Sequence, residues 1–222
     1  MSYLLIGVAL IVAIADWVAV ATQRKTLEYF AKPGVMLVLL VWLWQASGFS
    51  GSLVWFGLGL VFSMAGDICL MLPRERFIAG LVAFLLAHVA YVVGFNQTPT
   101  AFNLAGFVLA VLVTLVFLRV YRRIAAGLDA SGQPALKTPV LIYSLVISVM
   151  LLSALLTLAA DTWQAGAAIL VSAGALLFFL SDALLAWNKF VTPIKWGRLA
   201  VIITYHLGQI LITVGAAWHY LS

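Results

Sequence analysis

Long apolar runs constrain the fold of this chain more than any other feature. A hydrocarbon core of about 30 Å requires roughly 20 helical residues, and eight runs of near this length are present. They are Tyr3–Ala21, Gly34–Ser47, Leu53–Leu72, Phe77–Phe95, Phe102–Val120, Pro139–Ala160, Gly166–Trp187 and Trp196–Tyr220. The sequence therefore predicts an all-α polytopic membrane protein, in which residues 1–222 form a single domain of eight transmembrane helices in one bundle.

The composition excludes several other classes of protein. Hydrophobic residues make up 65% of the chain and charged residues 9%, too few for a soluble domain of this length. The single cysteine, Cys69, cannot form an internal disulfide or a thiolate metal cluster. The net charge is +5, but the basic residues lie in short, separated loops. Membrane phospholipids are therefore the expected acidic partner, and a nucleic acid is not.

The positions of the basic residues predict the orientation of the chain. All 12 Lys and Arg residues lie in or at the edge of the odd-numbered loops between the apolar runs. The even-numbered loops and both tails contain none. Because basic loops stay in the cytoplasm, we expect cytoplasmic odd loops and both termini outside, in the periplasm of a bacterial inner membrane.

Few ionisable residues are expected at membrane depth. They are Asp16, Asp67, His88, Asp182 and His206. The three aspartates each lie about six residues, or roughly 9 Å, from the cytoplasmic end of a helix, and the two histidines lie roughly 15 Å deep. We expect no Lys or Arg beside them, because the second run begins at Gly34 and leaves Lys32 in a loop. Such buried ionisable groups are functional candidates.

Helical periodicity adds polar neighbours to these groups. Residues three, four, seven or eight positions apart share a helix face. The neighbours selected in this way are Ser63, Tyr91, Ser181, Tyr205 and Gln209. We expect them to surround one cavity with the aspartates and histidines, where they bind substrate or orient water. A structural role for Asp16 is as consistent with the sequence as a functional one.

Basic residues near the cytoplasmic ends of the helices are candidates for binding the phosphate of a lipid head group. They are Arg74, Arg76, Lys189, Lys195 and Arg198. A weak internal echo is also present: an aspartate preceded by a small residue is followed, in the next helix, by a histidine. It occurs as Asp67 with His88 and as Asp182 with His206. The echo predicts a parallel repeat of a four-helix unit.

Two blocks of sequence around the aspartates are more specific. The first is Gly66-Asp67-Ile68-Cys69-Leu70-Met71-Leu72-Pro73, followed by Phe77, Gly80, Phe84, His88 and Tyr91. The second is Ser181-Asp182-Ala183-Leu184-Leu185-Ala186 with Asn188-Lys189-Phe190, followed by Thr204-Tyr205-His206-Leu207-Gly208-Gln209. Together they resemble the signature of the YhhN family of lysoplasmalogenases, and the resemblance extends over essentially the whole chain in the number and spacing of spans.

The resemblance implies an integral membrane hydrolase that cleaves the vinyl-ether bond of lysoplasmalogens. The implied products are a fatty aldehyde and glycerophosphoethanolamine or glycerophosphocholine. The family's two proposed catalytic aspartates correspond to Asp67 and Asp182.

The chemistry of vinyl-ether hydrolysis suits two carboxyl groups. Slow protonation of the β-carbon gives an oxocarbenium ion, which water captures. Burial and a neighbouring carboxylate both favour the protonated form of one aspartate, which can supply the proton. Its ionised partner can stabilise the cation and activate water, as in glycosidases. No cofactor is expected.

Two other classes of function stay open from the residues alone. A metal-dependent lipid hydrolase would use Asp67, Asp182, His88 and His206 around a zinc-bound water, although the sequence contains no HxxxH or HExxH pair. A proton-coupled transporter of small molecules or lipids would use the buried carboxylates as a proton relay. The sequence makes no prediction of oligomeric state.

Overall fold

The computed structural model describes residues 4–72, 76–97 and 103–222. Its helices are α1 (Leu4–Ala21), α2 (Lys25–Ser47), α3 (Leu53–Met71), α4 (Phe77–Phe95), α5 (Leu104–Ala130), α6 (Lys137–Leu156), α7 (Ala165–Phe190) and α8 (Gly197–Leu221). Short 3₁₀ turns, Pro134–Leu136 and Thr157–Ala159, flank α6. All eight α-helices are long and apolar enough to cross a membrane, and the described residues contain no strand. The prediction of an all-α, multi-pass membrane protein is confirmed.

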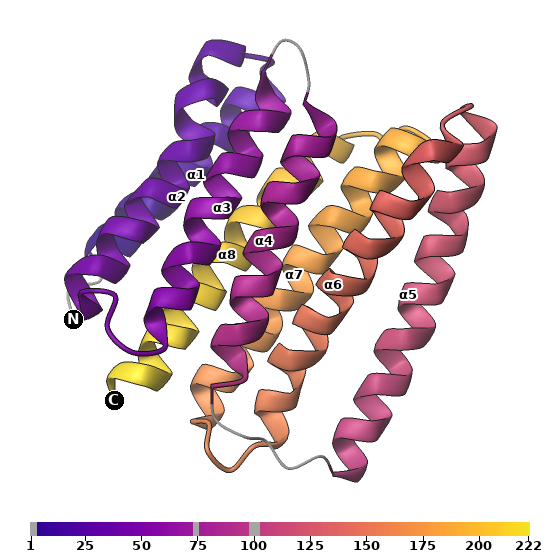
Figure 1. Cartoon of the computed structure of the whole chain (residues 1–222). Coiled ribbons are helices and arrows are strands. Elements are labelled where there is room, and N and C mark those ends of the chain that lie inside the picture. Colours follow the sequence, from indigo (N-terminus) through magenta and orange to yellow (C-terminus); the bar gives the residue numbers. More distant parts are fainter. Residues whose placement is uncertain (1–3, 73–75, 98–102) are drawn as a thin grey trace.

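The helices run roughly parallel to one another, so that successive connections alternate between the two ends of the bundle (Figure 1). Both chain ends lie at the same end, and the last turn of α3 and the first turn of α4 lie at the other. The connections from α1 to α2, α5 to α6 and α7 to α8, which have basic residues in them or in the adjoining helix turns, belong to the end opposite the termini. Its assignment to the cytoplasm stays a prediction, as do the internal repeat and the single-domain organisation.

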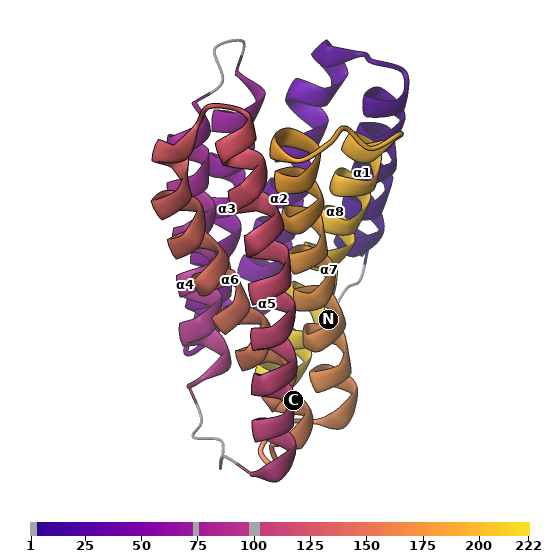
Figure 2. The same cartoon turned by 90° about the vertical axis from the view of Figure 1, so that its right-hand side faces the viewer.

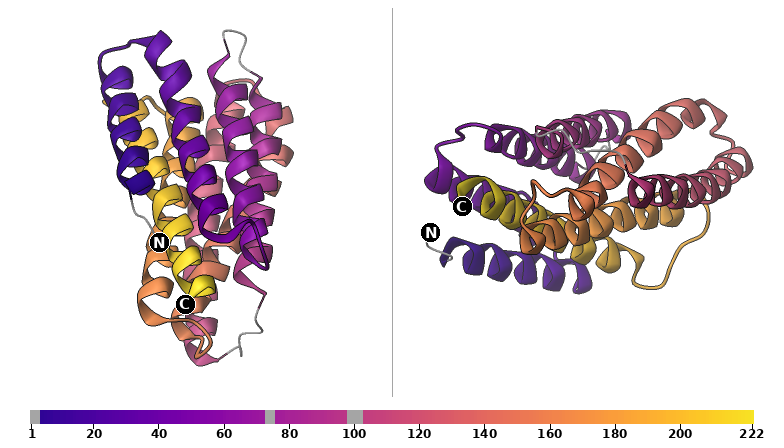
Figure 3. Two further views of the ribbon diagram at one scale, coloured as in Figure 1. Left: turned by 90° about the vertical axis from the view of Figure 1, so that its left-hand side faces the viewer. Right: turned by 90° about the horizontal axis from the view of Figure 1, so that it is seen from below.

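The bundle is asymmetric in how deeply its helices are buried. Helix α8 contacts α1, α2, α3 and α7, and it lies beside α1 in the view along the bundle (Figure 3). Helix α5 lies at the periphery (Figure 2), and of its 27 residues only Gly106, Val113, Ile124 and Leu128 are buried. The polar side chains of α8 therefore face protein from several directions, whereas much of α5 is left to face lipid.

Helices α7 and α8 approach each other at backbone distance. A Cβ atom at Gly174 would lie 2.7 Å from the carbonyl oxygen of Gly208 and from the amide nitrogen of Ile212. Small residues permit such close approach in membrane proteins, where packing rather than hydrophobicity holds helices together. This contact brings the later turns of α7 beside the early turns of α8, where Asp182 and Tyr205 lie.

Two helix boundaries differ from the sequence prediction in ways that matter. Helix α2 begins at Lys25 rather than at Gly34 and contains Pro33. Proline lacks one helical hydrogen bond, but helices buried in a membrane bundle tolerate this loss. Helix α5 continues to Ala130, well beyond the predicted end at Val120. The extension of α2 places Lys32 inside a membrane-spanning helix.

Candidate active site

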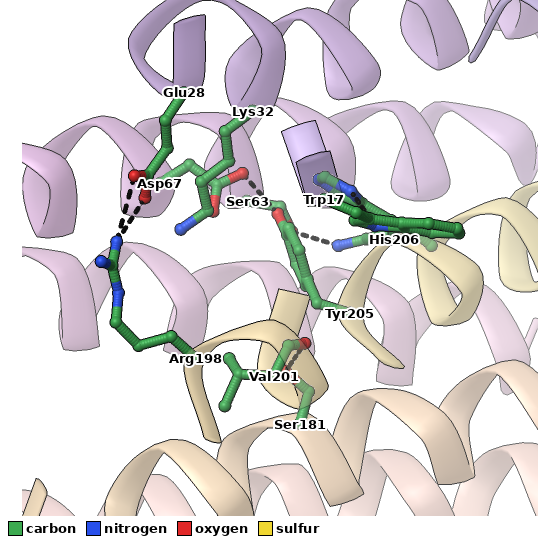
Figure 4. Close-up of polar contacts among 11 residues, drawn as sticks. Trp17, Glu28, Lys32, Ser63, Asp67, Ser181, Arg198, Val201, Tyr205 and His206 are labelled. Atoms are coloured by element: carbon green, nitrogen blue, oxygen red, sulfur yellow. Dashed lines mark hydrogen bonds and ion pairs between the residues drawn. The ribbon is translucent and has the colours of Figure 1, made fainter. Parts of the chain in front are cut away.

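Asp67 is the centre of a buried polar group at the junction of α2, α3 and α8. The hydroxyl of Tyr205 donates a hydrogen bond to its Oδ2 at 2.7 Å. The Nζ atom of Lys32 lies 3.1 Å from its Oδ1. Lys32, Asp67 and Tyr205 are drawn together in Figure 4. Asp67 is fully buried, and the Lys32 side chain is 15% exposed. The carboxyl group of Asp67 therefore has a cation on one oxygen and a hydroxyl donor on the other.

The position of Lys32 corrects the prediction that no basic residue lies beside the buried aspartates. The prediction was wrong because Pro33 and Lys32 resemble the end of a loop, whereas α2 continues through both. The spacing of apolar residues in α2 could have indicated that Lys32 belongs to the helix. Met36 and Leu43 are fully buried and lie four and eleven residues after Lys32, which is helical spacing.

Asp182 on α7 belongs to a second polar group. The hydroxyl of Tyr143 on α6 donates a hydrogen bond to its Oδ2. The Nε2 atom of His88 on α4 lies 2.9 Å from the Tyr143 hydroxyl and 3.3 Å from Asp182 Oδ2. His88 also packs against the ring of Phe178, with centroids 4.7 Å apart. Three helices thus hold this carboxyl group in position.

Tyr143 was not selected from the sequence, although it contacts both a candidate catalytic residue and a histidine. It lies in an apolar helix with no ionisable neighbour, a setting in which tyrosine is commonly a packing residue. Ser144 and Ser148 follow it on α6, and all three line the pocket described next. This stripe of polar residues on α6 is the sequence pattern that could have indicated a role for Tyr143 in the site.

Asp67 and Asp182 line the same pocket, to which each helix from α2 to α8 contributes lining residues. Most of its wall is apolar and includes Leu70, Leu81, Phe84, Phe117, Ile124, Ile147 and Phe179. Lys32, Tyr143, Ser181 and Tyr205 add polar groups. The hydroxyl of Ser181 donates to the backbone oxygen of Val201 at 3.0 Å. Two carboxyl groups from separate parts of the chain therefore line one chamber whose wall is mostly apolar.

Three of the predicted cavity residues form a separate buried group. Tyr91 donates to Gln209 Oε1 at 2.6 Å, and Gln209 Nε2 donates to Ser63 Oγ at 2.8 Å. None of the three lines a described pocket. Their contacts link α3, α4 and α8 and do not indicate contact with a substrate.

His206 and Asp16 also lie away from the pocket wall. His206 accepts a hydrogen bond at Nδ1 from Trp17 Nε1 at 3.2 Å. Asp16 is fully buried, and neither of its carboxyl oxygens has a hydrogen-bond partner among the described residues. Within the same residues, no group of three or more His, Cys, Asp or Glu side chains is arranged to hold a metal ion.

A second hollow adjoins the apolar pocket at the end of the bundle opposite the termini. The two share the lining residues Lys32, Leu70, Phe77, Leu185, Val201 and Ile202. The polar residues of this hollow, which we call the mouth, are Lys25, Glu28, Tyr29, Lys32, Asn188, Lys189 and Arg198. A polar mouth therefore leads to an apolar chamber, with Lys32 at the boundary.

The structure separates the five predicted phosphate ligands. Lys189 and Arg198 line the mouth, and Arg198 is paired with Glu28. Arg76 lines a neighbouring surface hollow, and Lys195 is exposed outside the mouth. Arg74 lies outside the described residues.

One known family matches most of the chain. The model of the YhhN family matches residues 27–216, a range that includes both aspartates and both pockets' polar residues except Lys25. The chain belongs to the YhhN family. No solved structure matches this YhhN-family chain.

Curated relatives of this YhhN-family chain carry enzyme names. Lysoplasmalogenase TMEM86B of Mus musculus is 32% identical over 90% of this chain and 79% of its own length. Lysoplasmalogenase TMEM86B of Homo sapiens is 32% identical over 82% of this chain and 71% of its own length. The membrane protein YhhN of Escherichia coli O157:H7 is 31% identical over 51% of this chain and 57% of its own length.

Proposed function

We propose that this YhhN-family protein is a membrane lysoplasmalogenase. It hydrolyses the vinyl-ether bond of a lysoplasmalogen to a fatty aldehyde and glycerophosphoethanolamine or glycerophosphocholine. Relatives named lysoplasmalogenase match most of the chain. The observation that carries the proposal is that Asp67 and Asp182 line one apolar pocket, because two positioned carboxyl groups in a sheltered site suit this reaction.

The shape of the two hollows fits an amphiphilic substrate. A lysolipid that leaves its charged head group in the mouth places its first chain carbons beside Asp67 and Asp182, and its alkyl chain continues along the apolar wall. A small water-soluble substrate would gain no binding free energy from an apolar wall of this kind. The geometry therefore supports a lipid with a reactive bond near its head group.

Asp67 is proposed to act as the ionised partner. Its contacts with Lys32 and Tyr205 come from a cation and a hydroxyl donor, and both favour the carboxylate. In this form Asp67 stabilises the oxocarbenium ion and accepts a proton from the attacking water.

Asp182 is proposed to act as the acid. Among the described residues, its side chain has hydrogen-bond contacts with Tyr143 and His88, and neither is a Lys or Arg side chain. With Tyr143 donating to Oδ2, the other oxygen is left to carry a proton. His88 and Tyr143 then act as positioning residues, because both contact the Oδ2 atom of the carboxyl group.

The proposed steps conserve protons. Asp182 transfers its proton to the β-carbon of the vinyl ether, and positive charge develops at the carbon bonded to the ether oxygen. Water adds to that carbon while Asp67 takes a proton, giving a hemiacetal. The hemiacetal hydroxyl loses its proton as the carbon–oxygen bond to glycerol breaks, and the glycerol oxygen gains one. Transfer of a proton from Asp67 to Asp182 restores the starting state.

We further propose that the protein resides in a bacterial inner membrane with the mouth facing the cytoplasm. All 12 Lys and Arg residues lie in the odd loops or in the adjoining parts of the helices, and this distribution supports the proposed orientation. The Escherichia coli relative, named a membrane protein, supports the compartment.

The purified full chain in detergent provides the test of the proposed function. It is given a lysoplasmalogen and, separately, an ester-linked lysolipid, and aldehyde is measured with and without a chelator. We expect aldehyde from the vinyl-ether lipid alone, at a rate that the chelator does not change. Chelator-sensitive release would favour the metal-dependent alternative, and no turnover of the vinyl-ether lipid would overturn the proposal.

A further inference from the structure

Glu28 is a carboxylate in the mouth that has no role in the mechanism above. It lies in the first turn of α2, and its side chain is only 12% exposed. A single nitrogen of Arg198, Nη2, contacts both carboxylate oxygens, at 2.7 and 3.1 Å. Figure 4 shows the guanidinium group of Arg198 directed toward the Glu28 carboxylate, and the Arg198 side chain is 59% exposed. A fixed acid is therefore covered by a cation that has room to move.

The charges around Glu28 make it distinctive. Among the described residues that line the mouth, it is the only carboxylate, and the cations are Lys25, Lys32, Lys189 and Arg198. At a site that binds phosphate alone, a carboxylate weakens binding, because it repels the phosphate and pairs with one of the cations. A zwitterionic head group, in contrast, carries a phosphate and an ammonium group and needs both signs of charge.

We propose that Glu28 is the binding subsite for the ammonium of a zwitterionic lysolipid head group, which enters by exchanging partners with the Glu28–Arg198 ion pair. The phosphate becomes the partner of Arg198, and the ammonium becomes the partner of Glu28. This proposal rests on the proposed function, because it assigns the head group of that same substrate.

Exchange is favourable because each charge keeps a partner. Leaving a mostly buried carboxylate unpaired is strongly unfavourable, so a ligand that removes Arg198 must replace its positive charge. Tyr29, the next residue, also lines the mouth, and an aromatic ring can attract a quaternary ammonium. A lysolipid that carries phosphate alone can engage Arg198 only by leaving Glu28 unpaired, and it is therefore discriminated against.

The position of Glu28 fits the reacting bond. It precedes Lys32 by four residues, which is one helical turn and a rise of about 6 Å. Lys32 lines both hollows and contacts Asp67. A head group beside Glu28 thus leaves the glycerol near Lys32 and the vinyl-ether bond near the two aspartates.

Binding of saturated alkyl-ether lysolipids tests the subsite without turnover, because they lack the vinyl bond that is protonated. The full chain in lipid nanodiscs is titrated with three such lipids, carrying phosphoethanolamine, phosphocholine or phosphate. We expect the wild-type protein to bind the two zwitterionic lipids more tightly. Glu28→Gln should weaken their binding on the order of tenfold or more. It should leave the phosphate lipid unchanged or more tightly bound, because Arg198 is released.

Asp129→Asn is the matched control. Asp129 is an exposed carboxylate that pairs with Lys137 at the same end of the bundle and does not line the mouth, so none of the three affinities should change. The proposal is overturned if Glu28→Gln changes all three affinities equally or none of them. If that variant does not fold, the wild-type protein still decides the question, because equal or tighter binding of the phosphate lipid overturns the subsite. Failure of the proposed function is a separate result, namely the absence of aldehyde from a vinyl-ether substrate.

Discussion

The ion pair between Lys32 and Asp67 predicts a specific pattern of stability. Lys32→Met keeps the length of the side chain and removes its charge. It leaves Asp67, which is fully buried, with Tyr205 as its hydrogen-bond donor. The free energy of unfolding should fall, because a buried carboxylate loses its counter-ion.

The expected magnitude follows from the burial of the pair. Removing one partner of a buried pair lowers stability by about 3–5 kcal/mol. The Lys32 side chain is 15% exposed, so we expect the lower end, about 3 kcal/mol, or a fall in Tm of roughly 6–12 °C for a chain of this length. Replacing both partners, as in Lys32→Met with Asp67→Asn, removes the unpaired charge. The double variant should therefore be more stable than Lys32→Met alone.

A double-mutant cycle in detergent measures this coupling through thermal unfolding, followed by the fluorescence of the eight tryptophans. We expect a coupling free energy of about 2 kcal/mol or more. The pair of Lys137 and Asp129 serves as the control cycle. Its side chains are 35% and 55% exposed, so its coupling should be below about 1 kcal/mol.

The reasoning is refuted if the two cycles give the same coupling, or if Lys32→Met unfolds at the wild-type temperature. Either result would mean that Lys32 does not neutralise Asp67 in the folded protein. The proposed ionised state of Asp67 would then lose its main support.

Four further variants test other parts of the site and bundle. Tyr143→Phe should lower kcat for aldehyde release by about tenfold with little change in KM, because Asp182 loses a hydrogen-bond donor. Gly174→Ala should destabilise the protein by about 3 kcal/mol, since a Cβ there meets backbone of α8. Gly7→Ala, where a Cβ meets nothing within 4 Å, should not lower the Tm. Asp16→Asn should keep most of the activity and should not lower the Tm, because the carboxyl oxygens of Asp16 have no described hydrogen-bond partner.

Hydropathy was sufficient to predict the eight helices because hydrocarbon leaves a backbone few alternatives. Each amide and carbonyl must be paired within the protein, so an apolar run of sufficient length becomes a helix. The start of α2 was missed because charge and proline were treated as a boundary. In the structure, the positive charge of Lys32 is balanced by Asp67, a residue on another helix, and a pattern local to the sequence does not contain that partner.

The sequence predicted that Asp67 and Asp182 share a cavity, which the structure bears out, but it did not predict the contacts of these two carboxyl groups. Periodicity placed Ser63 and Gln209 on the same helix faces as Asp67 and Tyr205. It does not indicate which helical turns on such a face line the pocket. Those two residues instead form their own hydrogen bond. The role of Tyr143 depends on what α4 and α7 present to its hydroxyl, and such information arises only from packing.

The rate of aldehyde release by Asp67→Asn and by Asp182→Asn, each compared with wild type at matched folded protein, tests the central proposal most directly. We expect each substitution to lower the rate by on the order of 10³-fold or more while the Tm shows a folded protein. Near-wild-type aldehyde release by either variant would contradict the joint action of the two carboxyl groups in one pocket.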